Sequence, residues 1–190
     1  MATMKPIWGE VFEMPATTTA DDLLRLPDGG YQYELFEGVV VRSMTSPAHG
    51  AICHRLDGEL YLYGRSSGFP NQIVQNALFD LTLPGAPNRT VLAPDLAIMR
   101  PAATPTWTVP QDVPLVAVEV ISASQSPAEL ALKAQVYRQA GVEEVWIIGH
   151  RSRTIHIWNA QGMTTLGETQ DLTSALLPGF AVSVRYLMDG

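Results

Sequence analysis

Two acidic residues interrupt strands that are otherwise apolar. Glu119 lies in "VAVEVIS" (residues 116–122), where apolar side chains occupy both alternating faces, a pattern typical of a strand covered on both sides. Asp95 follows Pro94 in the apolar "TVLAPDLAIMR" (residues 90–100). An ionised carboxylate that is buried without partners is strongly unfavourable. If the two strands are neighbours, the carboxylates can converge at one level of the sheet. They would repel each other unless a divalent cation such as Mg²⁺ or Mn²⁺ neutralises them or one of them holds a proton.

Lys133 could complete such a site. It lies in the segment after the Glu119 strand, beside Ala134 and Tyr137, and this spacing places it on or beside the helix face that packs on the sheet. An ammonium group there could orient a water molecule and stabilise the charge that develops in phosphoryl transfer. These residue types therefore suit metal-assisted cleavage of a phosphodiester.

The same residues also have structural interpretations. Glu119 and Lys133 could form a buried salt bridge that holds the helix on the sheet. Asp95 could simply cap a bend after its proline. His49 in "SPAHG" could be a hydrogen-bonded core residue, and Glu34 in "YELFEG" could point outward from its strand. Periodicity leaves both sets of interpretations open.

Other types of catalytic or metal site find little support. His54, His150 and His156 have no metal-ligand spacing, which argues against a histidine zinc site. Cys53 is the only cysteine, so it forms no internal disulfide, and in "AICHRL" it is most simply a small buried hydrophobe. The chain has no GxSxG motif, which excludes the common hydrolase nucleophile elbow.

Composition indicates one globular domain over residues 1–190, with 46% hydrophobic and 16% charged residues. The net charge of −7, with twelve scattered Lys and Arg residues, argues against broad electrostatic attraction to nucleic acid. The first residues lack the layout of a signal peptide, and no apolar run reaches about 18 residues. We therefore expect a cytoplasmic protein.

The first half of the chain has clear helix and turn signals. A short helix is predicted after Thr18 or Thr19, followed by a hairpin over residues 31–44 that turns at Glu37-Gly38. Ser46-Pro47 is typical of the start of a helix that ends at Gly64 or Gly68. Its helical spacing predicts one buried stripe, formed by Ile52, Leu56, Leu60 and Tyr63.

The second half alternates strands with one helix. We expect a long strand over residues 72–85, then a strand over 90–100 with an edge, bulge or bend at Pro94. A proline-rich loop (101–114) precedes the Glu119 strand. A helix then runs from Ser126-Pro127 to Gly141, followed by strands at 143–149 and 154–159 and an apolar tail. This order predicts an α/β fold, a mixed β-sheet flanked by helices, with an N-terminal helix and β-hairpin extension.

Five segments occur in an order that resembles the Uma family of putative restriction endonucleases, within the PD-(D/E)XK nuclease superfamily. They are "YELFEGVVV", "SPAHGAICHRL", "APDLAIM", "VAVEVIS" and "LKAQVYRQAGVEEVWII". The resemblance covers about residues 17–160, so 161–190 would be a C-terminal strand extension. It implies a restriction-endonuclease-like core and Mg²⁺-dependent hydrolysis of DNA phosphodiester bonds.

The resemblance also implies roles for individual residues. Asp95 matches the acid of the "PD" motif, and Glu119 matches the acid of the following strand. Ile121 occupies the usual position of the lysine, which would have migrated to Lys133 on the next helix. Glu34 and His49 match polar positions of the family and would line the same pocket, and the Val120 carbonyl would be a third metal ligand beside the two acids.

Three positions depart from the family pattern. They are Ser122-Ala123-Ser124 in place of Ser-Pro-Ser, Glu129 in place of Asp, and Gly149 where an acid is common. Two functions follow from the sequence: a metal-dependent DNA endonuclease, expected to be a homodimer because cutting a duplex needs two sites, or a catalytically silent nuclease fold that acts as a protein-interaction or regulatory module.

Overall fold

The computed structural model describes residues 10–12, 14–15, 18–27, 31–69, 72–100, 112–121 and 127–190. Its largest sheet has six strands in the order β11-β10-β9-β8-β7-β4. Only β8 and β9 are parallel neighbours, and the other neighbours in this sheet are antiparallel. The strands are β4 (Ile73–Gln75), β7 (Leu96–Ile98), β8 (Val116–Ile121), β9 (Glu144–Gly149), β10 (Thr154–Asn159) and β11 (Gly162–Gly167).

A second sheet has the order β1-β3-β2-β6-β5. The predicted hairpin forms its centre and turns at Glu37 and Gly38, whose φ angles of 47° and 81° suit a two-residue hairpin loop. The sheet consists of β1 (Glu10–Phe12), β2 (Gln32–Phe36), β3 (Val39–Ser43), β5 (Phe79–Asp80) and β6 (Val91–Leu92). The hairpin prediction is confirmed, and the hairpin is the centre of a sheet of its own.

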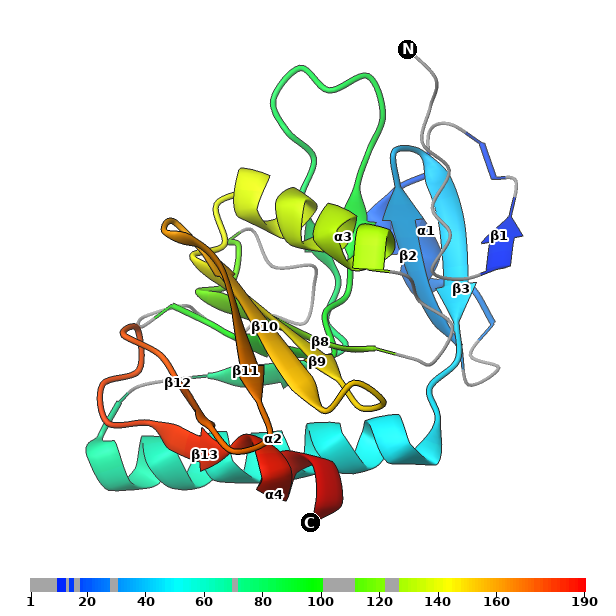
Figure 1. Ribbon diagram of the computed structural model, residues 1–190. Helices are drawn as coiled ribbons and strands as arrows, with labels where there is room; N and C mark the ends of the chain where they lie inside the picture. Colours follow the sequence, from blue (N-terminus) through cyan, green and yellow to red (C-terminus); the bar gives the residue numbers. More distant parts are fainter. Residues whose placement is uncertain are drawn as a thin grey trace.

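Helices cover both faces of the six-stranded sheet (Figure 1). One face carries α2 (Pro47–Ser67), with α4 (Val184–Asp189) and the small sheet of β12 (Asp171–Thr173) and β13 (Ala181–Ser183) beside it. The other face carries α3 (Pro127–Gln139), while α1 (Ala20–Leu24) contacts β2. This arrangement confirms the expected mixed sheet flanked by helices. Within the described ranges, no helix combines the length and apolar character that a membrane span requires.

Local signals correctly predicted the start of α1 and both ends of α2. The Thr19 side chain caps α1 and forms a capping box with Asp22. The Ser46 hydroxyl accepts the His49 backbone N–H at the start of α2, which ends at Gly68 in a left-handed conformation. The predicted stripe of α2 is buried, with its four members in one core cluster. These contacts hold the first turn of α2, and His49 with it, in a defined position.

The predicted long strand over residues 72–85 is wrong. The segment divides into β4, in the six-stranded sheet, and β5, in the second sheet. Between them Asn76 has a φ angle of 51°, a left-handed conformation that asparagine tolerates better than most residues. The turn at Asn76 sends the chain from one sheet to the other, which a pattern of alternating hydrophobicity does not reveal.

The segment around Pro94 also passes from one sheet to the other. β6 belongs to the second sheet and β7 to the six-stranded sheet, so Ala93, Pro94 and Asp95 cross between them. The predicted bend at Pro94 is therefore confirmed, and it is a junction of two sheets. Asp95 enters the six-stranded sheet at this junction, close to Glu34 of β2.

Several predicted features lie outside the described residues. They are most of the proline-rich loop (101–111) and residues 122–126, which include the departure at Ser122-Ala123-Ser124 and the predicted helix start at Ser126. The tail contains more structure than expected. β11 extends the six-stranded sheet beyond the predicted pair, and β13 leads into α4.

Candidate active site

Asp95 directly precedes β7, and Glu119 lies in the neighbouring strand β8. In the antiparallel register of β7 and β8, Leu96 pairs with Val118, so Asp95 stands opposite Glu119 one step further. Directly opposed residues in such a pair have Cβ atoms about 4.5–5.5 Å apart. Both carboxyl groups are buried. The strand arrangement required for convergence is therefore present.

His49 and Val120 hold the Asp95 carboxylate. Its Oδ2 atom accepts the Val120 backbone N–H at 2.6 Å and lies 2.9 Å from His49 Nε2. Burial lowers the pKa of His49, but the hydrogen bond and charge of Asp95 outweigh it, and the net shift is upward. His49 is therefore a buried residue that contacts Asp95. This is compatible both with its predicted position in the pocket and with its interpretation as a hydrogen-bonded core residue.

Glu119 forms a second set of contacts with α3. Its Oε1 atom lies 2.9 Å from Lys133 Nζ and accepts the Tyr137 hydroxyl at 2.7 Å. Lys133 Nζ also lies 3.1 Å from Glu34 Oε1, which accepts the Ala93 backbone N–H at 3.0 Å. Lys133 thus joins β8 of one sheet to β2 of the other. Glu34 is 3% exposed, so it does not point outward from its strand.

All predicted site residues except Glu34 line one small cavity of about 40 Å³. Such a space is large enough for a water molecule or an ion. The exposed segment of residues 44–46, between β3 and α2, forms its outer wall. Glu34 is outside this lining and contacts Lys133. The lining consists of Gln32, Ser43, Met44, Thr45, Ser46, His49, Asp95, Glu119, Val120 and Lys133.

The cluster has more negative than positive charge. Among the described residues, three buried carboxylates, on Glu34, Asp95 and Glu119, lie around one ammonium, that of Lys133, and one imidazole, that of His49, so the acids outnumber the bases. Burial raises the pKa of Glu119 to about 7, despite Lys133, with Glu34 and Asp95 adding to the rise. Burial alone would lower the pKa of Lys133, but Glu119 and Glu34 raise it, so the ammonium remains charged.

The donor atoms suit a hard divalent cation. Throughout the described part of the chain, the hydrogen bonds of Asp95 go to Oδ2 and those of Glu119 go to Oε1, so Oδ1 and Oε2 accept none. Both residues line the cavity. Carboxylate and carbonyl oxygens are the ligands that Mg²⁺ and Mn²⁺ prefer. Asp95, Glu119 and Val120 therefore fit such an ion.

A second possible ligand set overlaps the first. One donor atom each from His49, Cys53 and Asp95 lie within 4.8 Å of one another, a combination that would suit a softer metal. Burial raises the pKa of the Cys53 thiol to about 12, so a thiolate is disfavoured at neutral pH. His49 Nε2 already contacts Asp95. The oxygen set therefore fits better than the set that contains Cys53.

Sequence reasoning missed three features of this site. Tyr137, treated only as a neighbour of Lys133, donates directly to Glu119. Its position four residues after Lys133 on one helix face was a signal that could have identified it. Gln32 and Thr45 line the cavity without having stood out in the sequence. Ile121, at the usual lysine position, packs with the apolar core on the α3 face.

Comparison with known proteins identifies a family model and similar solved structures. The family model described as "Uma2: Putative restriction endonuclease" matches residues 20–185. The chain is also similar in structure to a crystal structure from Anabaena variabilis titled as a putative nuclease belonging to DUF820. That match has a TM-score of 0.72 and 16% sequence identity, and covers 88% of this chain and 96% of the other. It supports the fold alone. Curated proteins yielded no match.

Proposed function

Because the chain belongs to the Uma2 family of putative restriction endonucleases, we propose that it is a metal-dependent endonuclease that hydrolyses DNA phosphodiester bonds. The observation that carries the proposal is the pair Asp95 and Glu119, which face one cavity with one uncommitted carboxylate oxygen each. A purely structural ion pair would need one carboxylate for one lysine. Here the excess negative charge is what a bound divalent cation would neutralise.

The metal ligands would be Asp95, Glu119 and the Val120 carbonyl, with Mg²⁺ or Mn²⁺ as the ion. The N–H and C=O of one strand residue point to the same side, and the Val120 N–H points at Asp95. This geometry favours a carbonyl directed to the same region. Once bound, the ion would polarise the scissile phosphate and lower the pKa of an attacking water molecule.

The remaining site residues would stabilise the charge on the phosphate or hold the metal ligands and Lys133 in position. Lys133 would stabilise the charge that develops on the phosphate, because its ammonium lines the cavity and remains charged. His49 would hold Asp95 in its orientation through the 2.9 Å contact. Glu34 and Tyr137 would hold Lys133 and Glu119 in place from behind. We propose that all of residues 1–190 form one nuclease domain and that two copies pair to cut both strands of a duplex.

The alternative function is a catalytically silent nuclease fold that acts as an interaction module. The net charge of −7 favours it, since a lone DNA enzyme usually presents a basic surface. The buried acids oppose it. A silent copy gains nothing from three buried carboxylates around one lysine.

A nuclease assay separates the two functions. Plasmid and single-stranded DNA are incubated with the protein in Mg²⁺, Mn²⁺, Ca²⁺ or EDTA, beside the Asp95→Asn variant. We expect cleavage in Mg²⁺ or Mn²⁺, none in EDTA, and a loss of about a hundredfold or more in the variant. Arg151→Gln, an exposed change elsewhere, serves as the control and should cleave normally. Cleavage that is equal in Asp95→Asn and wild type would point to a contaminating nuclease, and no cleavage under any condition would favour the silent fold.

A further inference from the structure

A larger cavity of about 320 Å³ adjoins the candidate active site. It shares Gln32 and Thr45 with the small cavity that Asp95 and Glu119 line. Asn76, which also lines it, donates its backbone N–H to the Asp95 carbonyl at 3.4 Å. Its volume lies at the lower end of the range for small-molecule sites. The candidate site therefore opens beside a space that could hold one compact group.

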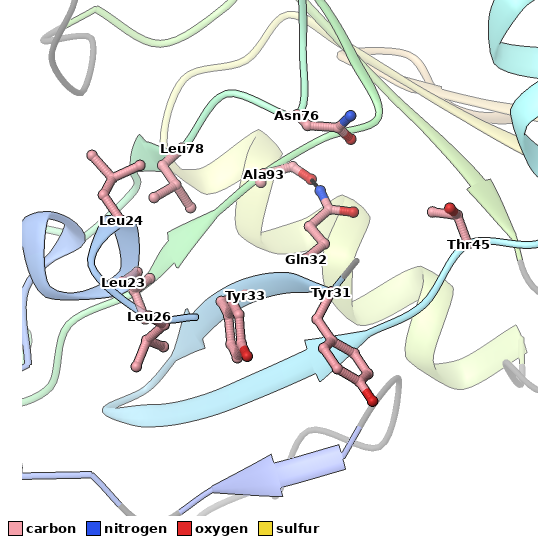
Figure 2. Close-up of a pocket in the computed structure, with 10 residues that line it drawn as sticks. All are labelled: Leu23, Leu24, Leu26, Tyr31, Gln32, Tyr33, Thr45, Asn76, Leu78 and Ala93. Atoms are coloured by element: carbon pink, nitrogen blue, oxygen red, sulfur yellow. Dashed lines mark hydrogen bonds between the residues drawn. The ribbon is translucent and has the colours of Figure 1, made fainter. Parts of the chain in front are cut away.

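The cavity has an apolar side and a polar side. Figure 2 shows leucines of α1 and Leu78 gathered on one side, with the polar side chains of Asn76, Gln32 and Thr45 on the other. Tyr33 lies on the hairpin side of the cavity. None of its described lining residues is an acid or a base. The lining thus suits a neutral, flat group that has polar edges, and disfavours a charged one.

Several polar groups in the cavity are available to a ligand. Gln32 donates its amide N–H to the Ala93 carbonyl at 2.5 Å, and its amide oxygen accepts no hydrogen bond from the described residues. The Asn76 amide and the Thr45 hydroxyl likewise make none within that part of the chain. These groups include both donors and acceptors, as the edge of a nucleobase requires.

We propose that this cavity is a nucleobase pocket, which receives one unstacked base of the DNA strand whose phosphate lies at Asp95 and Glu119. This rests on the proposed nuclease function. The base would pack between Tyr33 and the leucines, with its edge bonded to Asn76, Gln32 or Thr45. A base must leave its duplex stack to enter, so the pocket predicts a preference for single-stranded or locally unpaired DNA.

Binding, measured apart from cleavage, tests the pocket. The probe is a short fluorescein-labelled single-stranded oligonucleotide of mixed sequence, titrated by anisotropy in EDTA and in Ca²⁺. Tyr33→Leu should weaken binding about tenfold, because stacking of one base on an aromatic ring is worth about 1–3 kcal/mol. Tyr33→Phe keeps the ring and should bind like wild type. Tyr61→Leu, the same change at an exposed tyrosine of α2, is the matched control.

A probe with abasic sites identifies the base as the ligand. Wild type should bind it about as weakly as Tyr33→Leu binds the normal probe, and Tyr33→Leu should weaken its binding no further. Equal affinity of wild type for the two probes, equal binding by Tyr33→Leu and wild type, or no binding in either buffer would each overturn the pocket. Asp95→Asn separates the two proposals, since it should lose cleavage while retaining the difference between normal and abasic probes.

Discussion

Two clusters of acids and bases in this protein differ in burial and in balance. At the C-terminal end, Arg153 contacts Glu168 and bonds to Asp189 at 2.7 Å and 2.8 Å, while Arg185 lies 3.8 Å from Glu168. Two cations there face two acids, and their side chains are partly or fully exposed. Around Lys133, three buried acids face one lysine and one histidine among the described residues.

This difference distinguishes a surface ion-pair network from a charge cluster suited to binding a ligand. An exposed, balanced network is screened by water and contributes little to stability. A buried, unbalanced cluster destabilises the fold unless protons or a bound cation neutralise it, and the proposed metal site rests on the second of these. Four measurements test this contrast.

The largest effect is expected from Lys133→Met. In EDTA the change leaves Glu119 and Glu34 without their shared cation, and should lower the free energy of unfolding by about 3–5 kcal/mol. Arg153→Met, in the exposed network, should change it far less. Urea unfolding measures both. Cleavage per folded molecule should fall about a hundredfold in Lys133→Met and not in Arg153→Met. A destabilised Lys133→Met that cleaves normally would restrict this lysine to a structural role.

Raising the pH should destabilise the metal-free protein. The pKa of Glu119 rises from 4.5 to about 7 on folding, so the protonated carboxyl favours the folded state below the lower value, and this stability disappears as the pH passes the upper one. The loss between pH 5 and pH 8 should approach about 3 kcal/mol. The raised pKa of His49 has the same sign.

Urea unfolding in EDTA across that range measures the pH effect, with Glu119→Gln as the test variant. The variant cannot ionise and should have a flatter profile than wild type. A wild-type profile as flat as that of Glu119→Gln would mean that Glu119 titrates normally in the fold.

Divalent metal should raise the melting temperature of the wild-type protein. A ligand at a hundred times its Kd stabilises the native state by about 2.7 kcal/mol, or about 5–10 °C for a chain of this size. Mg²⁺ and Mn²⁺ are compared with EDTA by calorimetry. Asp95→Asn should lose the shift, whereas Arg153→Met should keep it. Because Asp95 belongs to both ligand sets, Cys53→Ser distinguishes them: the shift should persist in Cys53→Ser if the oxygen ligands bind the ion, and its loss there would assign the ion to the ligand set that contains Cys53.

The smallest effect should come from Tyr137→Phe. It removes the 2.7 Å hydrogen bond to Glu119 and keeps the buried ring, so we expect a loss of about 1–2 kcal/mol in EDTA. Tyr63→Phe, which removes a 3.1 Å bond to the Pro178 carbonyl, is the matched control with a neutral acceptor and should cost less. The Tyr137 hydroxyl stabilises the ionised form of Glu119, so its removal should also raise the pKa of Glu119. Equal losses in the two variants would mean that the charge of Glu119 adds nothing.

Part of the site could be predicted because its signals are local or periodic. The apolar run around Glu119 required a strand covered on both faces, and β8 is that strand. Ser46-Pro47 began α2 and so placed His49 in its first turn. The spacing of α3 placed Lys133 against the sheet. In each case a few residues that are close in the sequence were enough for the prediction.

The sequence by itself therefore determined the helix ends, the hairpin turn and the candidate acids, since capping, turn and burial preferences act within a few residues. Only the tertiary structure decided which strands belong to which sheet. It divided residues 72–85 at Asn76, brought Glu34 of β2 to Lys133 of α3, and placed the larger cavity next to the one that the acids line. The physical reason is that a two-residue period specifies which side chains are buried, while the partner strand and the opposing helix depend on contacts between residues far apart in the chain.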